Sequence, residues 1–389
     1  MTRNLRMIAL GMLLAGIVIH SPLLGGAAVI LAGATASTSW WTGRIERGLR
    51  VRYQAPVIIN YGETVDVAIS VTNTSLLPAP WLQMTDSVPP ALRVAAPPQT
   101  AFTLGAGATR DFSYPVRGGR RGYYRLGPLR LNMGDVLGLY TRQVSTPAAE
   151  LTVLPQVLPV GNLLLPAQQL FGPLQSATRR GEDPARPAGV RPYRASDGVR
   201  RLDWKSTARS GELLVRRAEP SVAPETTFAL AFRIEDYPAH VAKDSLERAI
   251  IACASLGAAL LARKLPVGFI TNGRDPKYPD ADVSLAQGKG DGQLQQLLQL
   301  LGRLDSGVGG TVWEQLARRP LPWGGTMVLV VSDLTADLLP QIVSLRRRGQ
   351  NLVLALLEPT PAGLALARSR SLTVYPIDER GVPILAAIS

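Results

Sequence analysis

Residues 325–334 read GTMVLVVSDL, a run of apolar and β-branched side chains that ends at a serine and an aspartate. A strand this uniformly apolar is typical of a parallel sheet covered on both faces. Strands are predicted in the same way at four other places, and amphipathic helices alternate with most of them. The alternation predicts a doubly wound α/β domain, with any site beyond the carboxyl ends of the strands. The expected strands are 226–234, 265–272, 325–334, 351–359 and 372–377, and the expected helices are 245–263, 292–304 and 338–348.

The segment immediately before this domain, residues 191–220, is dense in charge and carries one tryptophan: RPYRASDGVRRLDWKSTARSGELLVRRAEP. Basic residues outnumber acidic ones by about two to one from 179 to 217. Asp197 and Asp203 lie near arginines that could form bidentate pairs with them. Two readings follow. The segment either pins itself onto the α/β domain with Trp204 as an apolar anchor, or it docks an acidic partner or phosphate groups.

Further towards the amino terminus, residues 155–190 are rich in proline, glycine and arginine and show no periodicity, which predicts an extended connector. Residues 51–154 alternate short apolar and polar positions between turn residues. Strands at this spacing predict a β-sandwich domain. With a first segment at 1–50, and with the charged segment and the α/β domain together at 191–389, the expected protein is multidomain.

The first 50 residues predict a transmembrane helical hairpin. Charge is nearly absent from Leu5 to Trp41, and the sequence His-Ser-Pro at 20–22 interrupts this stretch. A single helix over 7–36 would run roughly 45 Å, against a hydrocarbon core of about 30 Å. Two short spans fit if the bilayer thins or flanking side chains reach the interface. One span or a cleaved signal peptide are the alternatives, the second because Ala-Thr-Ala at 34–36 resembles a cleavage site.

Arginines flank this apolar stretch on both sides. They precede it at Arg3 and Arg6 and follow it at Arg44, Arg47 and Arg50. The positive-inside rule therefore places both ends, and the soluble domains, on the cytoplasmic side of an inner membrane. The net charge of +13 would suit nucleic acid, an anionic membrane or an acidic protein equally well.

Few residues are available for catalysis. The chain has one cysteine, Cys253, within an apolar run, and two histidines, His20 and His240. This leaves almost no material for nucleophilic triads or zinc sites, and no phosphate-binding loop is present. Carboxylate chemistry through Glu235, Asp236 and Asp333 stays open, and no cofactor is expected.

The motif YRASDGVRRLDWKSTARSGELLVRRAE at 193–219, with RRGYYRLGPLRLNMGDVLGLY at 120–140, resembles the "domain of unknown function 58" family. The order of hairpin, β domain, signature and α/β tail is also similar to that family. The signature positions that we take as candidate partner-binding residues are Tyr193, Asp197, Arg201, Asp203, Trp204, Lys205, Arg209 and Arg216.

The resemblance implies that the tail is a von Willebrand factor A-like domain, which often holds a divalent cation through Asp-x-Ser-x-Ser, a threonine and an aspartate. The first strand here ends in Arg233-Ile-Glu-Asp instead, and an arginine at that point would repel a cation. Thr311 and Asp333 remain as degenerate candidates, and no metal is expected.

The resemblance also implies a partner, a MoxR-type AAA+ ATPase, and roles in chaperone-like assembly or in envelope and stress functions of bacteria. The leading hypothesis is therefore a membrane-anchored, non-catalytic interaction protein. One alternative is a metal-dependent hydrolase or ligand-binding protein with an atypical carboxylate site. Another is a nucleic-acid-binding protein, although the basic residues are not arranged on an aromatic strand platform or a recognition helix, so nucleic acid is not the expected partner.

Overall fold

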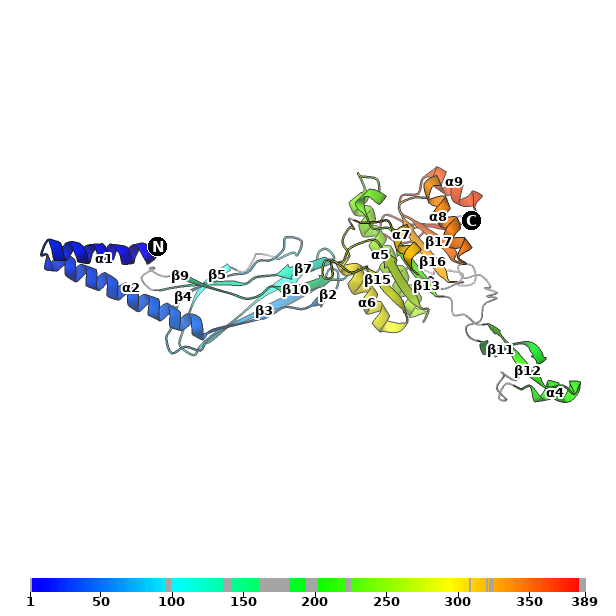
Figure 1. Cartoon of the computed structure of the whole chain (residues 1–389), viewed down its shortest axis with the longest axis horizontal. Helices are drawn as coiled ribbons and strands as arrows, with labels where there is room; N and C mark the ends of the chain where they lie inside the picture. Colours follow the sequence, from blue (N-terminus) through cyan, green and yellow to red (C-terminus); the bar gives the residue numbers. More distant parts are fainter. Residues whose placement is uncertain are drawn as a thin grey trace. The chain divides into compact units, whose positions relative to one another are not determined.

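The computed structural model describes residues 2–94, 99–135, 141–160, 182–193, 202–220, 225–307, 309–319, 321 and 325–384, and at 2–6, 182–189 and 216–220 it describes the backbone. The chain separates into two compact units, Met1–Pro155 and Gln156–Ser389. Each unit is described by itself (Figure 1).

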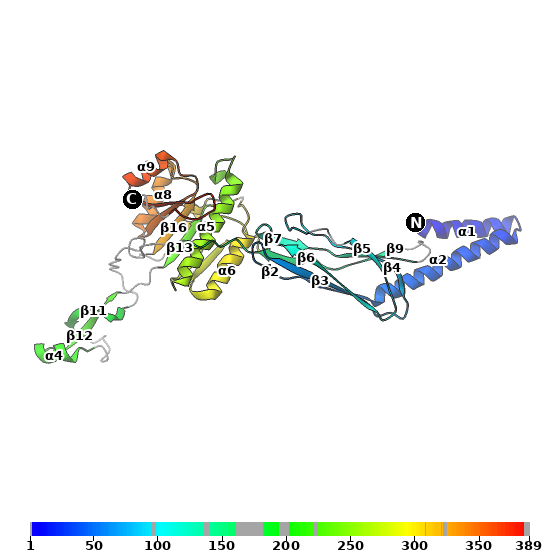
Figure 2. The same ribbon diagram turned by 180° about the vertical axis from the view of Figure 1, so that it is seen from behind.

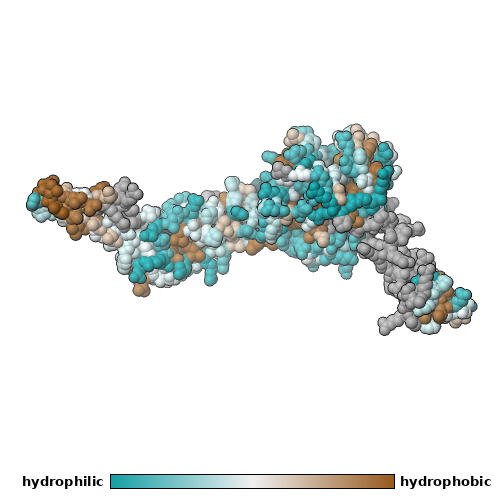
Figure 3. Space-filling model, viewed as in Figure 1, coloured by the Kyte–Doolittle hydropathy of each residue, from teal (hydrophilic) through white to brown (hydrophobic). Residues whose placement is uncertain are grey.

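Two helices open the first unit, α1 (Thr2–Val18) and α2 (Pro22–Gly48). The chain leaves the helix at 19–21, where the proline was predicted to interrupt it, and Pro22 occupies the first turn of α2. The helices lie side by side (Figure 1), and a Cβ on Gly16 would come within 2.9 Å of the amide nitrogen of Gly25. Glycine is needed at 16 because the two backbones approach so closely. Figure 3 shows hydrophobic surface over these helices.

Only α2 of this pair is long and apolar enough to cross a membrane by length and composition, because the apolar part of α1 covers just Met7–Val18. Many large apolar side chains in these helices are nonetheless exposed: Met7 is 65% exposed, Ile17 64% and Ile30 74%. This is the reverse of a water-soluble helix pair, which would bury such residues. The structure therefore supports an apolar amino-terminal helix suited to membrane association.

A β-rich region follows and completes the first unit. Its strands form one sheet in the order β1-β3-β6, a second in the order β2-β10-β7 and a third in the order β5-β4-β8-β9. Within the described residues, all the strand pairs are antiparallel except β2 with β10. The strands are β1 (Leu49–Gln54), β2 (Ile58–Ile59), β3 (Thr64–Asn73), β4 (Ala79–Thr85), β5 (Gln99–Leu104), β6 (Thr109–Arg117), β7 (Gly122–Leu126), β8 (Arg130–Gly134), β9 (Thr141–Ser145) and β10 (Ala149–Val153).

One hydrophobic core is shared by these sheets and by the end of α2. Val67, Ile69 and Val71 project into it from alternate positions of β3, as expected for a strand with one buried face. Ile45 of α2 and Leu49 of β1 belong to the same core. Because β1 begins at the residue after α2 ends, helix and β-rich region meet without a linker. The predicted boundary at residue 50 lies inside β1, after the end of α2 has already packed into the core.

The second unit contains a six-stranded sheet in the order β15-β14-β13-β16-β17-β18. Its strands are parallel apart from β15, which pairs antiparallel with β14. This confirms an α/β region at the carboxyl end of the chain. The strands are β13 (Thr226–Leu230), β14 (Val267–Thr271), β15 (Ser284–Gly288), β16 (Thr326–Val331), β17 (Asn351–Leu356) and β18 (Thr373–Pro376).

Helices cover both faces of this sheet (Figures 1 and 2). Phe228 and Leu230 of β13 pack on α5 and α6, while Ala229 between them packs on the opposite face with α7, α8 and α9. The strands are apolar throughout because each face has its own helical layer. The helices are η2 (Ile234–Asp236), α5 (Ala242–Ala262), α6 (Gly290–Arg303), α7 (Val312–Arg318), η3 (Ala336–Leu338), α8 (Leu339–Arg347) and α9 (Pro361–Ser369).

Helix α5 is also long and apolar enough to cross a membrane, but most of its apolar stretch is buried inside the protein. Ile250, Cys253 and Leu260 lie in the core against the sheet. Its hydrophobicity is that of a central helix of an α/β layer, not of a lipid-facing one.

An arm precedes the α/β sheet in the chain. It consists of β11 (Glu182–Pro192), α4 (Trp204–Ser210) and β12 (Leu214–Pro220), with β11 and β12 paired antiparallel. The strand β11 begins inside the stretch that we predicted as a connector, 155–190. Periodicity failed there because proline and glycine interrupt the alternation, and the pairing contains register shifts between Glu182 and Gly189.

Candidate functional site

The first candidate site is α4 and its supports in the arm. Asp203 is the N-cap of α4, and its carboxylate accepts the backbone N–H of Ser206 at 3.0 Å. Gly211 ends the helix at φ 74°, a conformation that favours glycine. A seven-residue helix has little stability of its own, so both ends need such termination.

Helix α4 is also tied to β12. The hydroxyl of Thr207 accepts the N–H of Leu214 at 3.0 Å. The N–H of Asp203 donates to the backbone carbonyl of Leu214 at 2.9 Å. Leu202 and Val215 pair as a β-bridge, and both are buried. These contacts hold α4 in one orientation on β12.

The exposed side chains of α4 and of the turn after it are apolar and basic. Trp204 is 62% exposed and Leu213 49% exposed, and α4 has no buried residue. Lys205 and Arg209 are exposed on the same helix. An exposed tryptophan on an ordered helix is unusual for a solvated surface and typical of a binding surface.

These positions can now be compared with the sequence expectations. Tyr193 is bonded to the arm through its N–H, which donates to Leu213 at 2.8 Å. Asp203 has a capping role that we had not assigned to it, although Asp at the start and Gly at the end of a helix are recognisable signals. Asp197 and Arg201 lie outside the described residues, and for Arg216 only the backbone, in β12, is described. The exposure of Trp204 gives no support to the anchoring interpretation.

The second candidate site is a cleft at the carboxyl ends of β13, β16 and β17, about 430 Å³ in volume. The chain continues from β13 to β14 on one side and later places β16 on the other, so this is the switch point where α/β proteins usually bind ligands. The structure places Thr311 and Asp333, the two degenerate metal candidates, in the lining of this cleft. The lining residues are Ala231, Asp236, Pro238, Thr311, Val312, Trp313, Val331, Ser332, Asp333, Thr335, Leu338, Glu358 and Thr360.

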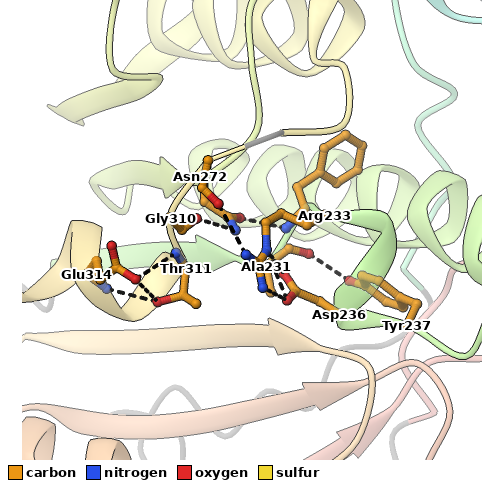
Figure 4. A network of polar contacts seen from close by, with 10 residues as sticks. Ala231, Arg233, Asp236, Tyr237, Asn272, Gly310, Thr311 and Glu314 are labelled. Atoms are coloured by element: carbon orange, nitrogen blue, oxygen red, sulfur yellow. Dashed lines mark hydrogen bonds and ion pairs between the residues drawn. The ribbon is translucent and has the colours of Figure 1, made fainter.

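Arg233 lies beside the cleft and points toward Asp236 (Figure 4). Its Nη2 lies 2.7 Å from Oδ1 of Asp236, and its Nη1 donates to the carbonyl of Gly309 at 3.1 Å. The hydrogen bond to Asp236 raises the pKa of Arg233 above its ordinary value. The Arg233 guanidinium therefore already pairs with the Asp236 carboxylate that a metal cation would need as a ligand.

Two further contacts fix the loop before α7. Asn272 accepts the N–H of Phe232 at 2.7 Å and donates to the carbonyl of Gly310 at 3.2 Å. Thr311 is the N-cap of α7 and forms a capping box with Glu314, in which each side chain binds the other residue's backbone N–H. The Thr311 hydroxyl is thus engaged in helix capping.

The other two carboxylates of the cleft are also bound by protein donors. Asp333 accepts the hydroxyl of Thr360 at 2.6 Å and the N–H of Leu334 at 2.8 Å. Glu358 accepts the hydroxyl of Ser245 at 2.7 Å and is paired with Arg248. No group of three or more histidine, cysteine or acidic side chains suited to a metal occurs in the described part of the chain. These donor sets do not fit the cation that the von Willebrand A-like resemblance implies.

The remaining catalytic candidates are poorly placed for chemistry. Cys253 is fully buried in α5, and burial raises the pKa of its thiol, so the reactive thiolate is disfavoured. His20 lies in the turn between α1 and α2, and His240 is exposed in the loop before α5.

A family model described as "Protein of unknown function DUF58" matches residues 189–364. The match confirms the resemblance to the DUF58 family over these residues. The matched segment takes in most of the arm and the α/β sheet as far as α9, so both candidate sites lie within it. No curated protein matches the chain.

Solved structures show weak partial similarity. Native alpha-2-macroglobulin from Escherichia coli is 17% identical over 28% of this chain and 17% of that chain, with a TM-score of 0.25. Salmonella alpha-2-macroglobulin reacted with methylamine is 15% identical over 27% of this chain and 7% of its own, with a TM-score of 0.22. A CARDB domain from Pyrococcus furiosus, in complex with di-metal ions, is 12% identical over 27% of this chain and 87% of its own, with a TM-score of 0.21. Similarity at this level carries no argument about fold or function.

Proposed function

We propose that this protein is a membrane-anchored, non-catalytic interaction protein whose arm docks a protein partner. The observation that carries the proposal is Trp204, 62% exposed on a helix that Asp203 caps and Thr207 ties to β12. Large aromatic side chains held rigidly in this way lose little conformational entropy on binding and commonly dominate interface energetics.

The anchor in this proposal is a helical hairpin, with α1 and α2 crossing the bilayer and both ends on the cytoplasmic side. The exposed apolar side chains of both helices support a lipid environment, and Trp40 with Arg44 beyond them suits the interface. The short apolar part of α1 requires local thinning of the bilayer or flanking side chains that reach the interface. The membrane would be the inner membrane of a bacterium.

The two soluble parts are proposed to be a β-sandwich and a von Willebrand factor A-like domain. Three sheets around one core support the first. A parallel sheet with helices on both faces and an antiparallel edge strand supports the second. In the second, an adhesion-type metal would lie beside the loop after β13, and the Arg233–Asp236 ion pair in that loop favours a recognition domain that works without a cation.

The partner proposed is a MoxR-type AAA+ ATPase, with a role in chaperone-like assembly or in envelope and stress functions. This rests on the family resemblance of the signature residues, and the apolar, basic face of α4 supplies a surface on which such a partner could bind. Lys205 and Arg209 would meet acidic residues around the tryptophan contact.

A detergent pull-down with the MoxR-type ATPase encoded in the same genome tests the proposal. Recovery of the ATPase by the wild-type chain, and its loss with Trp204→Ala plus Arg209→Ala, is the expected result. The control is Tyr61→Ala plus Arg52→Ala, which also removes one exposed aromatic and one exposed arginine, but in the β-rich region. Equal recovery by all three proteins would reject docking through α4.

The hydrolase alternative receives no specific support from the cleft, because Asp236, Asp333 and Glu358 are all bound by protein donors. It retains a direct test. Heat released on titrating Mg²⁺ or Ca²⁺ into the chain, abolished by Asp333→Ala, would favour it over the interaction proposal.

A further inference from the structure

The loop Thr74–Pro78, between β3 and β4, runs along the last two turns of α2. At one end, Thr74 donates both its N–H and its hydroxyl to the carbonyl of Gly48, at 2.8 and 2.7 Å. At the other end, the indole N–H of Trp41 donates to the carbonyl of Pro78 at 3.2 Å. The loop is therefore held against the helix at both ends.

This loop is also ordered from within. Asn73 is fully buried, and its amide group donates to the carbonyls of Leu77 and Gly105 at 2.8 and 3.0 Å. Its carbonyl oxygen accepts the hydroxyl of Ser75 at 2.7 Å. An Asx-type arrangement like this fixes the backbone of a turn.

The fixed turn presents Leu76 outward. Its side chain is 95% exposed, whereas Leu77 beside it packs on the β-rich core. A leucine held in water by an otherwise satisfied loop gains nothing for the fold of this chain. A single exposed leucine is common on protein surfaces, so what this one indicates depends on where the loop lies.

The position of the loop on α2 indicates what covers it. Trp41 lies at the end of the apolar stretch of α2, where a spanning helix leaves the hydrocarbon core, and Leu76 is two residues from Pro78. Two residues of chain span at most about 7 Å, and Thr74 on the other side of Leu76 is bonded to Gly48, so Leu76 lies between the levels of Trp41 and Gly48 along α2. On the exposed face of the same helix segment, Arg44 lies 5.7 Å from the ring of Trp40 and Arg47 follows one turn later.

We propose that the Thr74–Pro78 loop is a second membrane contact, in which Leu76 enters the interfacial region of the bilayer while Arg44 and Arg47 bind lipid phosphates. This rests on the proposed crossing of the membrane by α1 and α2. The lipid surface fits because an apolar tip flanked by tryptophan and arginine is the composition of interfacial anchors. The β-rich region is then held at a fixed tilt on the membrane surface by two contacts.

The experiment places one environment-sensitive fluorophore at a time on the full-length chain in nanodiscs that contain anionic lipid. The labelled variants are Leu76→Cys, Tyr61→Cys and Ile30→Cys, and the unsubstituted chain reports any labelling of the buried Cys253. Lipids that carry a nitroxide at a shallow or a deep position of the acyl chain serve as quenchers. Tyr61 is the matched control because it is exposed and lies beyond the opposite end of β3, a strand about 30 Å long.

The expected result is blue-shifted emission at Leu76→Cys that the shallow nitroxide quenches more than the deep one, with no quenching at Tyr61→Cys. Strong quenching at Ile30→Cys together with an unquenched label at position 76 would overturn the loop contact while leaving the spanning helices in place. An unquenched label at position 30 would overturn the spanning helices and the loop contact with them.

Discussion

Trp41 and Pro78 lie 37 residues apart in the sequence and are joined by a hydrogen bond from the indole N–H to the backbone carbonyl. This bond connects α2 to the β-rich region at a point where the helix also contributes Ile45 to the core. The helix and the β-rich region therefore form one body. A partner that moves the β-rich region would have to move the membrane-proximal part of α2 with it.

The contact between α2 and the β3–β4 loop predicts opposite effects for two glycines of the helix. A Cβ at Gly48 would lie 2.7 Å from the Cβ of Ser75 and 2.8 Å from its amide nitrogen, whereas at Gly43 the closest neighbour is 3.8 Å away. Gly48→Ala should cost about 1–3 kcal/mol through overpacking, and Gly43→Ala should stabilise the helix by up to about 1 kcal/mol. Hydrogen exchange of the amides at 41–48 measures both. Equal exchange in the two variants would contradict the close packing of the loop on α2.

Two tyrosines predict the alkaline limit of the β-rich region. Tyr53 and Tyr114 both donate to Oδ2 of the buried Asp86, at 3.0 and 2.5 Å. Burial raises the pKa of both tyrosines above the ordinary 10.0. For Tyr114, the hydrogen bond to the Asp86 carboxylate raises the pKa further. Because the unfolded chain releases these protons first, the stabilisation is complete below about pH 10 and falls as the pH rises further.

Tyr114→Phe tests this pair. Removing the donor should lower local stability near neutral pH by about 1–2 kcal/mol, because Asp86 stays buried, and should also weaken the loss above pH 10. Exchange of β6 amides across a pH series is the measurement, and Tyr61→Phe on the exposed surface is the control. An unchanged alkaline slope in Tyr114→Phe would rule out this origin.

The capping box of α7 predicts an acid-sensitive helix end. The backbone N–H of Thr311 and then its hydroxyl bind the Glu314 carboxylate and lower its pKa below the ordinary 4.5. A lowered folded pKa stabilises the helix above the unfolded value and loses that effect as the pH falls through the folded one. Protection of the α7 amides should therefore decline below about pH 4.5, and Glu314→Gln should remove this dependence. Thr311→Ala should cost about 1 kcal/mol near neutral pH and should weaken the acid dependence, because the Thr311 hydroxyl helps to lower the pKa of Glu314. A pH-dependent decline that persists in Glu314→Gln would contradict the assignment.

Much of the α/β region could be predicted from the sequence because each strand is apolar on both faces, and helices were expected within a few residues of α5, α6 and α8. The strand β15 was missed, since Ser284–Gly288 is short and half polar and gains its place only by pairing with the edge of β14. The network at the cleft could not be predicted either. Arg233, Asn272 and Gly310 come from three loops that only the fold brings together.

In the arm, two substitutions of Asp203 can distinguish its role as a helix cap from the effect of its charge. Asparagine caps helices about as well as aspartate, whereas alanine does not. Asp203→Ala should therefore destabilise α4 by about 1 kcal/mol, which corresponds to roughly fivefold faster amide exchange in the helix. Asp203→Asn should exchange at a rate close to that of the wild type. Equal loss in both variants would mean that the carboxylate charge, not the cap to Ser206, orders this helix.

The most direct test of the central claim is an equilibrium titration of the purified MoxR-type ATPase onto the full-length chain in nanodiscs. Truncating an exposed tryptophan that anchors an interface costs about 2 kcal/mol or more, a rise in Kd of about thirtyfold. Trp204→Ala plus Arg209→Ala should show that rise, while Tyr61→Ala plus Arg52→Ala binds as the wild type does. The same Kd for all three proteins, with α4 shown by hydrogen exchange to be folded, would contradict the account.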